Sequence, residues 1–217
     1  SLSGKAVFVN AEDSSSIYVT LDKTDGLRTA DVLSSQGQSS KECYSVSENS
    51  TSNSRKIVAY ANCLKDGSFK FENLEAGIYT VYATSPDSQE RAVFRNITID
   101  EEEEKIILEK LKLTATGTLS GKITLDSSES NNSGFTVYIG GTSYMAKTGL
   151  SGDFTITGIP AGKDYELFIE YGTYTYYWKN ADVSAFQNYE LGTINLSTDE
   201  IKSYSLFKEG KNGTAGK

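Results

Sequence analysis

The chain contains an internal repeat, and this repeat constrains its fold more than any other feature. LSGK at residues 2–5 returns at 119–122, and DGSFKFENLEAGIYTVY (66–82) returns in altered form as SGDFTITGIPAGKDYELFIEY (151–171). A repeat of this length indicates two copies of one domain, each large enough to bury its own core. It specifies architecture well and activity poorly, because one fold can carry many functions.

The spacing between matching residues locates the difference between the copies. It falls from 118 residues (Leu21 to Ile139) to 85 residues (Gly67 to Gly152), so the first copy carries 33 extra residues between these points. We therefore predict copy one at 1–113 with an insertion at about 22–62, a linker at 114–118, copy two at 119–197 and a tail at 198–217. A linker this short predicts a semi-rigid arrangement.

The composition predicts an all-β fold. Fourteen Tyr and nineteen Gly stand beside one Met and two Pro, which favours strands and turns over helices. In copy two, alternation predicts seven strands, at 119–125, 135–139, 143–147, 154–157, 165–171, 173–178 and 189–196. A tight connection between two strands is expected at 158–162 (Gly-Ile-Pro-Ala-Gly). Seven short strands suit a Greek-key β-sandwich, so the chain is predicted to form two in tandem.

Residues at period two within these strands should face the core. This predicted core set of copy two is Ile123, Leu125, Val137, Ile139, Phe154, Ile156, Leu167, Ile169, Ile194 and Leu196.

Composition also argues against several functions. The chain has no His, which removes the commonest general base and metal ligand and argues against an enzyme. Its net charge of −8 would repel a nucleic acid backbone. The apolar runs are only strand-sized, and neither a membrane span nor a signal peptide is visible, as expected of a mature or trimmed fragment. No cofactor is expected.

The order of motifs resembles a known family. A strand opening on SGK, a Gly-x-Phe strand, a Gly-Ile-Pro-Ala-Gly turn, a Tyr-x-Leu strand and an aromatic stretch follow one another in residues 119–196. This order resembles the carboxypeptidase regulatory-like domain, a prealbumin-like (transthyretin-like) sandwich, and is similar to the B-type repeats of collagen adhesins. In copy one the resemblance covers 2–21 and 66–113, with Glu-Ala-Gly in place of Pro-Ala-Gly.

The resemblance implies a non-catalytic stalk, spacer or adhesion module of an exported, extracellular or cell-surface protein, often bacterial. Such a protein can be lipid-anchored or periplasmic. Its expected partner is a host or cell-surface protein or a glycan, and the fragment itself is expected to be a monomer.

Two cysteines lie in or beside the insertion. Cys63 falls at the end of a predicted framework strand, and Cys43 lies within the Ser-rich insertion, which is too polar to build a core. In an exported protein a Cys43–Cys63 disulfide would fasten this loop to the sandwich, with a stabilisation of about 3 kcal/mol. The alternative is two unpaired thiols. A long loop of this kind is also a candidate binding site.

An aromatic run distinguishes copy two. In YGTYTYYW (171–178), strand alternation places Tyr174, Tyr176 and Trp178 on one face. If exposed, this row could stack on sugar rings or anchor a protein partner, which makes a carbohydrate-binding module the alternative function. Otherwise, these side chains complete the core or the interface between copies.

Two further patterns suggest weaker sites. The acidic run at 100–104 would bind Ca²⁺ only if its oxygens converged, and a linear run is more typical of a solvated turn. The adhesin resemblance also suggests a crosslink of Lys122 to Asn195 assisted by Glu170, chemistry that needs burial. Both Lys122 and Asn195 alternate out of phase with the core set. Copy one has Lys5, Lys112 and Ala83 at the corresponding places.

Overall fold

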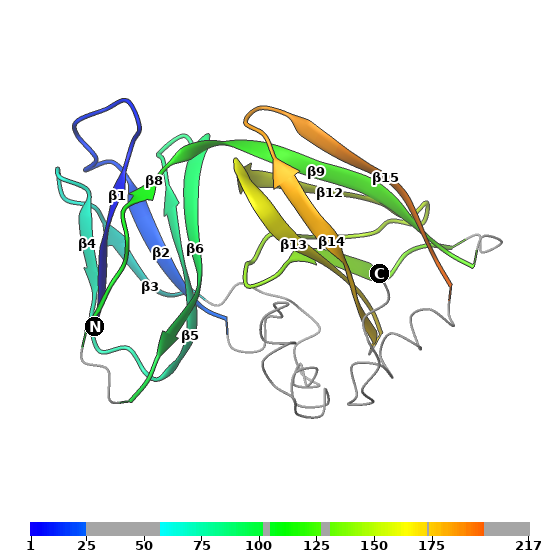
Figure 1. Ribbon diagram of the computed structural model, residues 1–217, viewed down its shortest axis with the longest axis horizontal. Helices are drawn as coiled ribbons and strands as arrows, with labels where there is room; N and C mark the ends of the chain where they lie inside the picture. The colour runs from blue at the N-terminus through cyan, green and yellow to red at the C-terminus, as the bar shows by residue number, and fades with distance from the viewer. Residues whose placement is uncertain (25–56, 102–104, 127–130, 173, 198–217) are drawn as a thin grey trace.

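The computed structural model describes residues 1–24, 57–101, 105–126, 131–172 and 174–197, with the main chain alone for 174–179. The described residues form fifteen strands and no helix, so none of them crosses a membrane as a helix (Figure 1). The all-β prediction is confirmed.

Copy one contributes β1 (Leu2–Val7), β2 (Tyr18–Lys23), β3 (Ile57–Asn62), β4 (Ser68–Phe71), β5 (Gly77–Thr84), β6 (Glu90–Ile99), β7 (Ile106–Ile107) and β8 (Leu111–Lys112). The remaining strands are β9 (Thr114–Leu125), β10 (Phe135–Ile139), β11 (Met145–Lys147), β12 (Asp153–Pro160), β13 (Gly162–Tyr171), β14 (Tyr174–Val183) and β15 (Asn188–Leu196).

Each copy packs one sheet against another. In copy one, β1 pairs with β4, β7 and β8, and the facing sheet has the order β3-β2-β5-β6. In copy two, β9 lies between β12 and β15, and the facing sheet has the order β11-β10-β13-β14. The hydrophobic core accordingly forms two clusters, one from residues 2–113 and one from 119–196 plus Tyr82. All predicted core residues of copy two are buried except Leu125, which is half-buried against the same cluster.

The duplication extends to individual hydrogen bonds. The loop before each second strand and the turn before each Gly-x-Phe strand make the same main-chain contacts in both copies. The matching pairs are Ala6 N–Gly67 O with Ile123 N–Gly152 O, Ser14 N–Lys65 O with Asn132 N–Leu150 O, and Cys63 N–Ile17 O with Thr148 N–Phe135 O, all at 2.9–3.0 Å.

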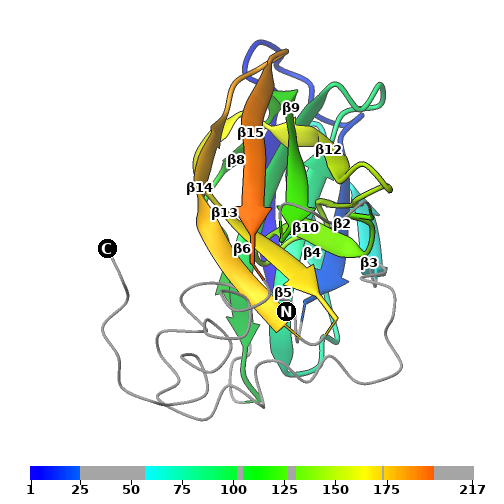
Figure 2. The ribbon, with the colours of Figure 1, turned by 90° about the vertical axis from the view of Figure 1, so that its right-hand side faces the viewer.

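Strand β9 joins the two copies. Its first residues pair with β6 (Thr114 with Arg91 and Ala115 with Glu90), so that β12, β9, β6, β5, β2 and β3 form one continuous sheet, with β15 also paired to β9. Figure 2, viewed from the side of copy two, shows β9 between β12 and β15. Residues 114–118, expected to be a linker, are therefore strand, because their main-chain groups find partners in both copies.

Two other segments differ from expectation. The connection at 158–162 is tight, as predicted, but most of the segment is strand. β12 continues to Pro160, because a register shift between Ile156 and Ile159 accommodates Gly158 at φ +70°, and only Ala161 separates it from β13. The insertion predicted at about 22–62 begins and ends in strand, since β2 runs to Lys23 and β3 occupies Ile57–Asn62.

The outer face of the second sheet of copy two also carries buried aromatic residues. Tyr138 and Phe168 are cross-strand partners that stack at 5.5 Å with an interplanar angle of 15°. They alternate with the core residues Val137 and Ile169, yet both are buried. They occupy the positions of Thr20 and Tyr82 in the β2–β5 pair of copy one.

Candidate functional site

The two copies meet through a hairpin and a sheet face as well as through β9. The connection between β10 and β11, residues 140–144, lies on the outer face of β5 and β6. Three polar side chains of copy one bond its main chain: the Thr80 hydroxyl donates to Gly141 O (2.6 Å), the Arg95 guanidinium donates to Gly140 O (3.2 Å), and the Tyr82 hydroxyl accepts from Ser143 N–H (2.7 Å).

Tyr82 is the centre of this contact. It is only 4% exposed, belongs to the core cluster of copy two, and contacts the Tyr144 ring edge-on at 5.7 Å. Burial raises the pKa of the Tyr82 hydroxyl well above its usual value, because the phenolate would lose its hydration. Nearby, burial raises the pKa of Tyr165 to about 12, and the Arg95 guanidinium lies 5.6 Å from the centre of that ring.

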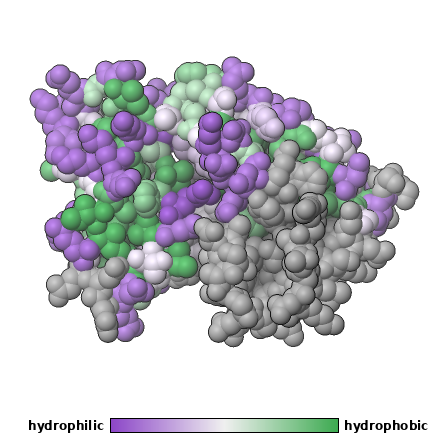
Figure 3. Space-filling view, in the orientation of Figure 1, coloured by the Kyte–Doolittle hydropathy of each residue, from purple (hydrophilic) through white to green (hydrophobic). Residues whose placement is uncertain are grey.

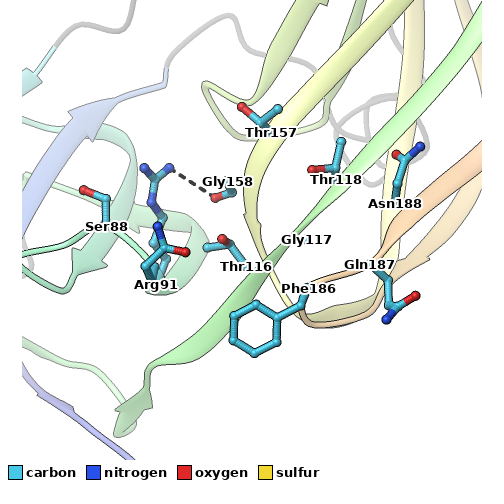
Figure 4. A pocket seen from close by; sticks show the side chains of 11 residues that line it. Ser88, Arg91, Thr116, Gly117, Thr118, Thr157, Gly158, Phe186, Gln187 and Asn188 are labelled. Atoms are coloured by element: carbon cyan, nitrogen blue, oxygen red, sulfur yellow. Dashed lines mark hydrogen bonds between the residues drawn. The ribbon is translucent and has the colours of Figure 1, made fainter.

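Beside the junction lies an open groove of about 590 Å³ (Figure 4). Its lining comes from four segments that are distant in sequence: Ser88, Gln89 and Arg91 around the start of β6, residues 116–118 of β9, Thr157 and Gly158 of β12, and residues 186–188 before and at the start of β15. Polar side chains predominate, and none of these described lining residues is acidic. On the face shown in Figure 3, hydrophobic residues gather over copy one and hydrophilic residues gather where the copies meet.

Two glycines allow the walls of the groove to approach one another. A Cβ on Gly117 would lie 2.3 Å from Ser184 O, and a Cβ on Gly158 would lie 2.7 Å from Nη1 of Arg91. The same Arg91 nitrogen donates to Gly158 O at 3.1 Å, so the guanidinium bridges β6 and β12. Its Nε is buried with no hydrogen-bond partner, and Arg91 makes no ion pair with a described residue.

Phe186 is the aromatic residue of this groove. It is 76% exposed and has φ +59°, a backbone conformation that a non-glycine residue adopts at an energetic cost. Its N–H donates to Thr116 O (2.8 Å), and the neighbouring Gln187 O accepts from Thr118 N–H (2.9 Å), which fixes the loop to β9. Sequence reasoning missed this residue, although an aromatic residue between two predicted strands, followed by Gln187 and Asn188, was a visible signal.

The predicted aromatic row lies on strand β14, which pairs with β13 alone among the described strands. Its register sets Tyr174 opposite Tyr171 and Tyr176 opposite Ile169. The side chains of Tyr174, Tyr176 and Trp178 lie outside the described part of the structure, so their role stays a prediction.

Of the two cysteines, the structure describes Cys63. It is buried directly after β3 and forms no disulfide with a described residue. Burial raises the pKa of this thiol to about 11. Cys43 lies outside the described residues, so the Cys43–Cys63 disulfide also stays a prediction.

The weaker candidates find little geometric support. Within the described residues no group of three or more acidic or Cys side chains converges on a point, although 102–104 of the acidic run lie outside them. For the crosslink, Asn195 is exposed and accepts a hydrogen bond from the Thr124 hydroxyl, while Lys122 is opposite Thr193 in the register.

No protein-family model and no curated protein matches the chain. Solved structures do match. A chain of a type II cohesin–X–dockerin complex from Acetivibrio cellulolyticus is 36% identical over 36% of this chain and 52% of that chain, with a TM-score of 0.31. The present chain thus spans about half the length of that relative.

Two pilins match over more of their length. A minor pilin of Streptococcus agalactiae is 14% identical, with 91% of this chain and 96% of that chain covered and a TM-score of 0.33. A shaft pilin of Lactobacillus rhamnosus GG is 10% identical, with 90% and 96% covered and a TM-score of 0.32. Likenesses at these TM-scores do not assign the chain to a family, and membership of the carboxypeptidase regulatory-like family stays a prediction.

Proposed function

We propose that the chain is a non-catalytic structural or adhesion module of an exported, cell-surface or secreted protein of bacterial origin. The observation that carries the proposal is the junction. A continuous sheet through β6 and β9, together with the hairpin docked on β5 and β6, holds the two copies in a fixed relation. Fixed spacing is a property that a stalk or a presenting platform requires and a pair of freely linked domains lacks.

The distribution of side chains supports the same proposal. At the junction, copy two contributes the main chain of its hairpin and core residues. Copy one contributes the side chains of Thr80, Tyr82 and Arg95. These groups hold copies together and leave the loops at the sandwich ends free to contact a host or cell-surface protein or a glycan. Lipid anchoring and a periplasmic location are further forms that the same role can take.

Surface exposure on intact cells tests this proposal. An antibody against the folded chain should label intact cells of the source organism or detect the protein in the medium, and external protease should remove the cell-bound signal. Detection only after cell lysis, beside a cytosolic marker with the same behaviour, would contradict it.

A carbohydrate-binding module is the second candidate. Its expected residues Tyr174, Tyr176 and Trp178 lie on β14, which has β13 as its one described neighbour in the sheet. Glycan binding measured by calorimetry and lost in Trp178→Ala would support it. Binding that is unchanged in Trp178→Ala would rule out this strand as the binding surface.

A further inference from the structure

The groove at the junction is open to solvent and has the volume of a small-ligand site. Its volume of about 590 Å³ lies within the range of ligand pockets, roughly 300–1,000 Å³. At Gly117 and Gly158 a Cβ would clash with Ser184 O and with Nη1 of Arg91, so glycine allows β9 and β12 to approach these groups. Because the walls belong to β6, β9 and β12, which share one sheet, the groove is held by regular structure.

The polar groups of the groove are available to a ligand. Ser88, Thr116, Thr118, Thr157 and Gln187 make no side-chain hydrogen bond within the described structure. Hydroxyl and amide groups both donate and accept, so the set matches a ligand whose own groups do both. A phosphorylated ligand would instead be expected to meet several cations, and Arg91 is the one cationic residue among the described lining residues.

Phe186 supplies the complementary apolar surface. Its ring is exposed on a loop that two main-chain hydrogen bonds fix to β9, so little ordering entropy is lost when a ligand stacks on it. Figure 4 shows Phe186 and Arg91 on either side of Thr116. One ligand can therefore meet an aromatic face, hydroxyl groups and a guanidinium together.

Arg91 favours a ligand with a negative charge. No lining residue is acidic, and Arg91 makes no ion pair with a described residue, so its guanidinium has no counter-charge there. A carboxylate on the ligand would supply the missing counter-charge through a charge-assisted hydrogen bond.

We propose that this groove binds saccharides that carry a carboxylate, of the uronic acid class. The sugar ring stacks on Phe186, its hydroxyls bond the Ser, Thr and Gln side chains, and its carboxylate pairs with Arg91. The site is separate from the aromatic row of β14, and it stands or falls independently of the structural role of the chain.

Calorimetric titration of the full chain with an oligogalacturonate, and with the same oligosaccharide after carboxyl reduction, tests the proposal. We expect binding of the acidic form and at least tenfold weaker binding of the reduced form. Phe186→Ala and Phe186→Gly should each weaken binding at least tenfold. Phe186→Gly should also raise the melting temperature, because glycine accepts φ +59° without strain, and so separates loss of binding from loss of folding.

Arg91→Gln should abolish the preference for the acidic form. Arg91 also bridges to Gly158, so the substitution could loosen the junction. The rotational correlation time of the variant is therefore compared with that of the unmodified protein. Tyr60→Ala removes an aromatic of similar exposure (80%) from copy one and should change nothing. Absence of binding at millimolar oligogalacturonate, equal binding of both forms, or loss of binding in Trp178→Ala instead of the Phe186 variants would overturn the proposal.

Discussion

Gly67 and Gly152 show how one residue fixes the same turn in both copies. Their φ values are +81° and +88°, and an added Cβ would lie 2.2 Å from Ala6 O and 1.9 Å from Ile123 O. The obstructing atoms belong to the main chain of the first strand of each copy, so no side chain can move aside to make room. The glycine of the Gly-x-Phe motif is therefore required by the close approach of two strands as well as by its backbone angle.

Substitution of Gly152 is expected to be costly. Gly152→Ala should lower the free energy of unfolding by about 2 kcal/mol or more, because the left-handed backbone and the contact with Ile123 O are both strained. Chemical denaturation followed by circular dichroism measures the change. Gly149→Ala is the control, since its Cβ would meet no atom within 4 Å, and an equal loss in both variants would contradict the explanation.

The Cys63 thiol should be unreactive in the folded protein. A shift of its pKa from 9.0 to about 11 lowers the thiolate fraction near pH 8 about a hundredfold, and the thiolate is the reactive form. In a Cys43→Ser variant, alkylation by iodoacetamide should therefore be at least that much slower before unfolding than after it. A comparable rate in both states would show that the thiol is accessible.

The same shift sets the sign of a pH effect. Below pH 9 the thiol is protonated in both folded and unfolded states and adds no pH dependence. As the pH rises from 9 to about 11, the unfolded state ionises first, so this group lowers the stability of the folded protein over that window. Cys63→Ala should reduce the slope of stability against pH there.

At the scale of the element, β5 has side chains buried on both of its faces. Val81 and Ala83 face the core of copy one, while Thr80 and Tyr82 face the hairpin of copy two. A strand with two buried faces is expected at the centre of a multilayer structure, and in this chain the second layer is supplied by the other copy.

Removal of the Tyr82 hydroxyl should weaken the junction. Tyr82→Phe leaves the Ser143 N–H without its acceptor, at a cost of about 1–3 kcal/mol. Thermal unfolding and hydrogen exchange of the Ser143 amide measure the effect. Tyr18→Phe, at an exposed position with no side-chain hydrogen bond to a described residue, should leave both unchanged. Faster exchange in both variants would argue against a local cause.

Sequence patterns predicted the elements better than their ends. Period-two alternation identified the core set because its members occupy every second position of their strands, as Ile123 does in β9 and Phe154 does in β12. Residues 114–118 were predicted as a linker and not as strand because their partner, β6, lies in the other copy. The extension of β12 was missed because Gly158 and Pro160 are turn residues in most contexts. The groove was beyond sequence reasoning, since Arg91, Thr116, Thr157 and Phe186 come together only through the junction.

At the scale of the whole molecule, the two copies should tumble as one body. Relaxation of backbone amides should give one rotational correlation time, that of a 23.6 kDa particle, for both copies. A Gly-Gly-Ser insertion between Leu113 and Thr114 should shorten it in both copies, because it separates β6 from β9. The same insertion between the exposed Val9 and Asn10 is the control. Two different correlation times in the unmodified protein would disprove a rigid junction.

The docked hairpin also gives the molecule a direction. Copy two contributes the 140–144 connection and copy one contributes the face around Tyr82, so the contact is heterologous and does not close on itself as a two-fold dimer does. The face of copy two that corresponds to the face around Tyr82 carries Tyr138 and Phe168. A third copy docked on copy two would therefore meet side chains different from Thr80 and Tyr82. The two copies therefore contribute different surfaces to the contact and are not interchangeable.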